Sequence, residues 1–187
     1  MRRFGSAVVF ASIVVLTGCV GSIYALWAGP DMTMDRRLVG TWNDVGSKSW
    51  FEVSATGPFT YLVVMHDDSG KVGRFQGLLG RIDERLVMDI QPDVTALTVP
   101  DAYTGLLQPM HGFLFIDSIG AHPKVSILDP DSVKHYITAH PGAVRADTLS
   151  AGVVLEGTPR DLQAFLMGYL RRPGIFSEPM RLARRAP

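Results

Sequence analysis

Five histidines and one cysteine are the side chains best suited to metal binding or nucleophilic chemistry, and their spacing favours neither. Only His135 and His140 are expected on the same helix, and a separation of five helical residues turns two side chains about 140° apart. A zinc site needs several ligands that converge on one ion. The other histidines are His66, His111 and His122, which lie far apart in the sequence, so we expect no metal site.

Motifs that carry known catalytic chemistry are also missing. The sequence has no Gly-x-Ser-x-Gly elbow and no Gly-x-Gly-x-x-Gly, and Gly70-Lys71 lacks the upstream glycine and the following Ser or Thr of a phosphate loop. Asp131 and His135 are four residues apart, a spacing at which two side chains can pair across one turn on the surface of a helix. Asp129 and Asp131 suit a helix start better than a calcium site. We therefore expect a protein that is not an enzyme, with no catalytic residue and no cofactor.

The single cysteine, Cys19, follows an N-terminal segment of the signal type. Met1-Arg2-Arg3 is a short basic start, residues 7–16 form an apolar core, and residues 4–30 carry no charge. An apolar core of about ten residues is typical of a signal peptide and is shorter than a membrane span.

Leu16-Thr17-Gly18-Cys19 resembles the lipobox of bacterial lipoproteins. The resemblance implies signal cleavage between Gly18 and Cys19 and a diacylglycerol on the thiol of Cys19, a membrane anchor that two or three acyl chains make stable. Two alternatives stay open: Cys19 is a small buried hydrophobe, or the uncut segment continues to Trp27 as a membrane span. Val20 stands where lipoproteins of the inner membrane typically carry Asp. The resemblance therefore favours the cell envelope, at the periplasmic face of the outer membrane.

The composition is that of a folded chain, and the length allows one domain or at most a small pair. Hydrophobic residues make up 47% of the 187 residues, and 18 Lys and Arg balance 18 Asp and Glu. Nucleic-acid binding needs clustered basic residues, and the only tight cluster is Arg181, Arg184 and Arg185, so we expect no nucleic-acid partner. We divide the chain into a signal peptide (1–18), a lipidated cysteine with a linker (19–36) and a β-rich domain (37–187).

Short apolar runs between turn residues predict an antiparallel β-meander from Leu38 onward. Asp67-Asp68-Ser69-Gly70 predicts a hairpin. Gly73, Gly77 and Gly80 indicate bends or close backbone approach in the strand that follows. Residues 91–109 contain three prolines and no periodicity, and we expect a long irregular connection there. The expected strands cover residues 38–42, 49–53, 59–66, 72–82, 84–90, 111–117, 124–128, 144–149 and 152–156.

Two helices are expected, each starting with a capping side chain before proline. Asp129-Pro130 begins a short inserted helix near residues 130–140, and Thr158-Pro159 begins a C-terminal amphipathic helix over residues 159–171. The apolar stripe of the first includes His140, which we expect to be a buried histidine. The stripe of the second is Leu162, Phe165, Leu166, Tyr169 and Leu170, which predicts docking on the sheet.

Gly40-Thr41-Trp42 resembles the opening of a lipocalin or calycin barrel, and the resemblance covers residues 38–90. It implies that Trp42 plugs one end of a barrel whose interior holds a small apolar ligand. The Thr-Asp-Tyr motif of later lipocalin strands is missing, and an inserted helix is atypical of the family. The predicted fold is mainly β (α+β), as either a closed barrel or a strongly curved open sheet with helices on one face.

Two functions from different classes follow from the predicted fold and anchor. The first is a membrane-anchored envelope lipoprotein whose β-rich domain binds a small apolar ligand or lipid. The second is a structural lipoprotein with a filled core that contacts another envelope protein, with residues 91–109 as its contact. A ligand site has a volume of about 300–1,000 Å³, whereas a filled small barrel leaves almost none. The expected lining of a ligand site is Trp42, Phe51, Tyr61, Phe75 or Phe113.

Overall fold

The computed structural model describes residues 19–96, 107–120, 122–149 and 152–185, and within them twelve strands form one sheet. Eight of these strands close into an antiparallel barrel. Closure occurs where β9 pairs with both β8 and β12, and β12 pairs with β3. The barrel strands are β3 (Gly40–Asp44), β4 (Trp50–Ala55), β5 (Thr60–His66), β6 (Val72–Ile82), β7 (Arg85–Pro92), β8 (His111–Ser118), β9 (Lys124–Ser126) and β12 (Met180–Arg184).

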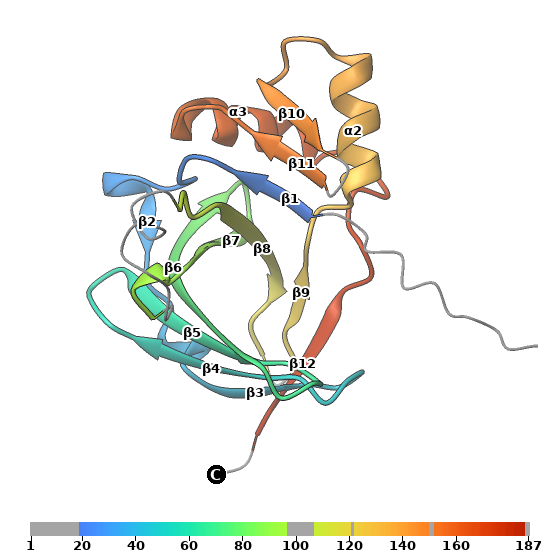
Figure 1. Cartoon of the computed structure of the whole chain (residues 1–187). Coiled ribbons are helices and arrows are strands. Elements are labelled where there is room, and N and C mark those ends of the chain that lie inside the picture. The colour runs from blue at the N-terminus through green and yellow to red at the C-terminus, as the bar shows by residue number, and fades with distance from the viewer. Residues whose placement is uncertain (1–18, 97–106, 121, 150–151, 186–187) are drawn as a thin grey trace, which may run out of the picture.

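The barrel follows the meander that the sequence predicts, because each strand from β3 to β8 pairs with the next one in the chain. The view of Figure 1 runs roughly along its axis, with these strands arranged as a ring. Alternate residues of β7 face inward, as its apolar alternation predicts. The interior core is made of Leu38, Tyr61, Val63, Leu79, Leu86, Met88, Ile116 and Val125.

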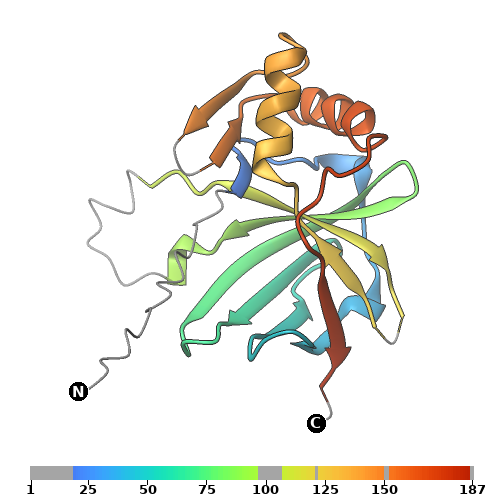
Figure 2. The same ribbon diagram turned by 90° about the vertical axis from the view of Figure 1, so that its right-hand side faces the viewer.

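A second layer covers one outer wall of the barrel. It contains β1 (Cys19–Ser22), β10 (Ala146–Leu149) and β11 (Gly152–Leu155), with helices α2 (Pro130–Ala139) and α3 (Pro159–Tyr169). Strand β1 pairs with the start of β8 and runs parallel to β11. In both views the two helices gather on this side of the barrel (Figures 1 and 2). Strands β6–β8 therefore form a wall with apolar side chains on both faces, including Val87, Phe113 and Phe115 on the outside.

The helix boundaries agree closely with the sequence signals. The carboxylate of Asp129 accepts a hydrogen bond from the backbone of Ser132 at the start of α2. A capping box between Thr158 and Asp161 begins α3. The expected apolar face of α3 is buried, with Leu162 and Leu166 fully inaccessible. His140 differs from the prediction: it is exposed beyond the end of α2, where its ring stacks on Tyr136.

Residues 19–36 do not form the linker that the sequence predicts. Leu26 and Trp27 are buried in the outer core. The backbone N–H of Leu26 donates to Asp89 (2.6 Å), and the indole N–H of Trp27 donates to the carbonyl of Val87 (3.0 Å). A Cβ at Gly80 would overlap the Trp27 ring, which confirms a close approach at this glycine. Residues 19–36 pack against the barrel because their apolar side chains cover the apolar outer face of strands β6–β8.

Two further short elements complete the fold near the N-terminus. Strand β2 (Met32–Thr33) pairs with β6, and the 3-10 turn η2 (Arg36–Leu38) precedes β3. Strands β1, β2 and β12 were not expected from the sequence. Among the described residues, no helix combines the length and the apolarity needed to cross a membrane.

We expect Leu166→Asp to lower the free energy of unfolding by about 4 kcal/mol or more, because it removes a fully buried side chain and places a charge in the outer core. Met167→Asp is the matched control, since Met167 on the same helix is 43% exposed. Thermal or urea denaturation of both variants measures the difference. Equal stability of the two variants would show that α3 does not dock through this face.

Candidate functional site

The barrel interior contains a small apolar cavity, here called the interior cavity. Its volume is about 70 Å³. Among the described residues every lining side chain is apolar except for the indole N–H of Trp42, which is bonded to the Leu38 carbonyl, so these side chains offer no free hydrogen-bonding or charged group to a bound molecule. The lining residues are Leu38, Trp42, Phe51, Val53, Val63, Met88, Leu114, Ile116, Pro123, Val125, Met180 and Leu182.

Trp42 and Arg184 close one end of the barrel together. The indole N–H of Trp42 donates to the carbonyl of Leu38 (2.8 Å), and the Arg184 guanidinium lies 4.6 Å from the centre of the indole ring. Arg184 also donates to the carbonyls of Arg37 (2.9 Å) and Val39 (3.2 Å). Gly40 has a φ of 141°, and a Cβ there would overlap the guanidinium. Both fixed residues of the Gly-x-Trp motif thus have a role, because the glycine makes room for the cation that covers the tryptophan.

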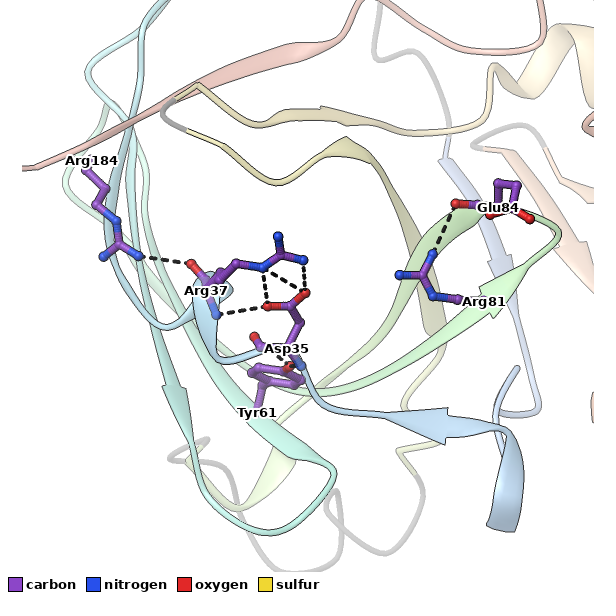
Figure 3. Close-up of polar contacts among 6 residues, drawn as sticks. All are labelled: Asp35, Arg37, Tyr61, Arg81, Glu84 and Arg184. Atoms are coloured by element: carbon purple, nitrogen blue, oxygen red, sulfur yellow. Dashed lines mark hydrogen bonds and ion pairs between the residues drawn. The ribbon is translucent and has the colours of Figure 1, made fainter.

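A second set of polar contacts holds the chain that crosses this end (Figure 3). Asp35 pairs with Arg37 (2.6 Å), and the backbone N–H of Asp35 donates to the hydroxyl of Tyr61 (2.7 Å). The hydrogen bond from Arg37 holds the pKa of Asp35 below its ordinary value. Burial raises the pKa of Tyr61, which keeps this hydroxyl protonated. Arg81, which donates to the carbonyl of Glu84, adds a positive charge that also lowers the pKa of Asp35.

The opposite end of the barrel carries an open apolar depression, here called the rim groove. Its volume is about 360 Å³, and it extends from the barrel strands to the first residues of β1. Leu114 lines both the rim groove and the interior cavity. The groove is lined by Cys19, Val20, Gly21, Phe75, Ile90, Pro92, Met110, His111, Gly112, Phe113, Leu114 and Ile127.

Cys19, the residue singled out for lipid attachment, begins β1 and has an exposed, free thiol at the rim groove. Of the five side chains expected to line a ligand site, Trp42 and Phe51 line the interior cavity and Phe75 lines the rim groove, whereas Tyr61 lines neither and is buried in the interior core. Phe113 also lines the rim groove, although its side chain lies on the outer face of β8 and belongs to the core beneath the helices.

Asp89 and His111 form a buried polar pair that the sequence analysis missed. Asp89 Oδ1 lies 2.8 Å from His111 Nδ1, and the carboxylate is almost completely buried. A pocket of about 270 Å³ on the outer wall adjoins this pair. Ser22 is opposite His111 in the β1–β8 register, but its hydroxyl donates to the carbonyl of Tyr24 (2.8 Å). The structure therefore does not align these three side chains as a Ser-His-Asp relay.

The five histidines are dispersed. His66 stacks on Trp50, while Asp131 pairs with Lys134 (3.7 Å) and not with His135. Across the described residues, no three His, Cys, Asp or Glu side chains are grouped closely enough to hold a metal ion. The irregular connection expected over residues 91–109 contains β-strand and 3-10 residues up to Ala96, and residues 97–106 lie outside the described part of the chain.

Comparisons of the chain with protein-family models, with curated proteins and with solved structures find no match. The closed eight-stranded antiparallel barrel is consistent with the lipocalin-like fold that Gly40-Thr41-Trp42 implies.

Arg184→Met should lower the free energy of unfolding by about 1 to 3 kcal/mol, because it removes two hydrogen bonds from a charged donor and the cation over Trp42. Arg185→Met serves as the control, since Arg185 also lies over a tryptophan ring, that of Trp50. The measurement is urea denaturation followed by tryptophan fluorescence. A loss for Arg184→Met no larger than that for the control would contradict the closing role of Arg184.

Proposed function

We propose that this protein is a lipid-anchored envelope protein whose barrel binds a slender apolar ligand, such as an acyl chain. One observation carries the proposal: the interior cavity and the rim groove are both apolar and share Leu114, while Trp42 and Arg184 close the opposite end. A ligand would enter from the open end and would be recognised mainly by its hydrocarbon surface, since no polar side chain among the described residues lines the cavity except Trp42, whose indole N–H is already bonded, and the groove adds only the Cys19 thiol and His111.

The dimensions support a ligand that lies mainly in the rim groove. The groove volume of about 360 Å³ lies within the usual range of ligand sites, whereas the interior cavity of about 70 Å³ lies below it. A narrow hydrocarbon chain fits this combination, because its end alone would reach past Leu114. A bulky ring system would require the interior side chains to move.

The position of Cys19 supports the proposed anchor. Cleavage between Gly18 and Cys19 would leave every described element intact, because β1 begins at Cys19. The thiol is exposed, as lipid attachment requires. The proposed location is the periplasmic face of the outer membrane, because Val20 occupies the position after the cysteine where lipoproteins of the inner membrane typically carry Asp.

The small interior cavity favours a second candidate function. A barrel filled by its own side chains needs no ligand, and about 70 Å³ is close to that condition. The protein would then act through its outer surface on another envelope protein. The two candidates share the anchor and differ in whether the rim groove has an occupant.

Native mass spectrometry separates the two candidates. We would express residues 19–187 with Cys19→Ser in the periplasm, since a chain that began at Asp31 would lack the buried Leu26 and Trp27. We expect a reproducible extra mass of a few hundred daltons over the denatured mass. Leu114→Trp should reduce this extra species because a larger side chain at the residue that lines both sites would fill part of them, whereas Val72→Trp, at a position 57% exposed, should not. A bare mass, unchanged after incubation with a lipid extract, would favour the interaction protein.

The anchor has its own test. In the full-length chain, Cys19→Ser should leave an uncut precursor without lipid, because the resemblance assigns both cleavage and lipidation to this residue. Metabolic labelling with a palmitate analogue and the mass of the product measure both events. Normal processing and release of the mutant would refute the lipid anchor without affecting the proposed ligand site.

A further inference from the structure

Three cationic or titratable side chains meet on the outer wall of the barrel, at the pairing of β9 with β12. A cleft of about 370 Å³ lies there, here called the cationic cleft, and its lining residues are Val45, His122, Lys124 and Arg181. No carboxylate of the described residues lines it. The whole chain carries equal numbers of basic and acidic residues, so the cleft is a local concentration of positive charge.

Lys124 and Arg181 are direct cross-strand partners in the β9–β12 register. Side chains of such partners stand side by side on one face of a sheet, and like charges in this arrangement destabilise the pairing. Both residues are exposed, and within the described chain neither forms a salt bridge. Their repulsion is therefore not relieved by an acidic side chain of the described structure.

The backbone around the cleft is held by hydrogen bonds. Val45 N–H donates to the carbonyl of Arg181 (2.8 Å), and Leu182 N–H donates to the carbonyl of Pro123 (2.8 Å). Asp44, the acidic residue beside Val45, uses its carboxylate within its own turn to accept from Gly46 N–H and the Ser47 hydroxyl. The cations are thus carried on a fixed frame, while the adjacent carboxylate has other partners.

We propose that the cationic cleft binds a phosphate group, either as free phosphate or as the head group of a phospholipid. Arg presents a planar fork of donors that matches phosphate oxygens, and Lys adds a compact positive charge. A phosphate between Lys124 and Arg181 converts their repulsion into two attractive contacts, and His122 supplies a third donor. This site is separate from the apolar cavity and does not depend on the proposed apolar ligand.

The test is the thermal stability of the full chain in dodecyl maltoside micelles at pH 7 and constant ionic strength, with phosphate replacing chloride. Phosphate at about ten times its Kd should raise the Tm of the wild-type protein by roughly 3 to 6 °C. The double variant Lys124→Gln/Arg181→Gln should lose this shift, and its Tm in chloride should equal or exceed that of the wild type because the like charges are gone.

The matched control is Arg160→Gln/Arg171→Gln, which removes the same charge from exposed positions on and beside α3 and should keep the full phosphate shift. A second arm replaces inorganic phosphate with micelles that contain phosphatidylglycerol. A shift in this arm alone, again lost in the cleft variant, identifies a lipid head group as the source of the phosphate. No shift in either arm, or an equal shift in the wild type and the cleft variant, would overturn the proposal.

Discussion

The pairing of β12 with both β9 and β3 is the constraint on which the rest of the structure depends. Strands β3 to β9 alone form a meander with two free edges, and one short strand joins them. This strand places Met180 and Leu182 in the cavity lining and Arg184 over Trp42. It also brings Arg181 beside Lys124. The interior, the closed end and the cationic cleft are therefore consequences of the same pairing.

Much of the strand order could be predicted from the sequence because it is local. The hairpin at Asp67–Gly70 and the alternation of Leu86, Met88 and Ile90 determine neighbouring pairs and the face that each residue occupies. Strand β12 was not predicted because the segment Met180–Arg184 is short and strongly basic, so its alternation of apolar and polar residues is weak. Strand β1 was not predicted because it lies within the uncharged run of residues 4–30, which has the features of a signal segment. The last part of that run, with Leu26 and Trp27, is nevertheless buried in the core.

The residues of the candidate site could be predicted only where a single residue belongs to a recognisable sequence motif. Trp42 is such a residue, since its motif marks the end of a barrel. Arg184 lies 142 positions later, and only the closed register places its guanidinium over the indole. Phe113 shows the opposite limit: β8 is apolar on both faces, so the sequence does not tell which face is interior. The Asp89–His111 pair likewise depends on a long-range register, between β7 and β8.

The pairing of β1 with β11 has a consequence for the order in which the molecule can form. Residues Cys19–Ser22 lie beside residues Gly152–Leu155. The first described strand therefore cannot complete its pairing until β11, one of the last strands in the chain, is present. Closure by β12 comes later still. When the chain emerges with its N-terminus first, the meander β3–β8 can therefore assemble first, with Trp27 and the outer wall uncovered until the last third of the chain arrives. This open intermediate exposes apolar surface on both faces of one wall, and it would be the state that most needs protection by a chaperone.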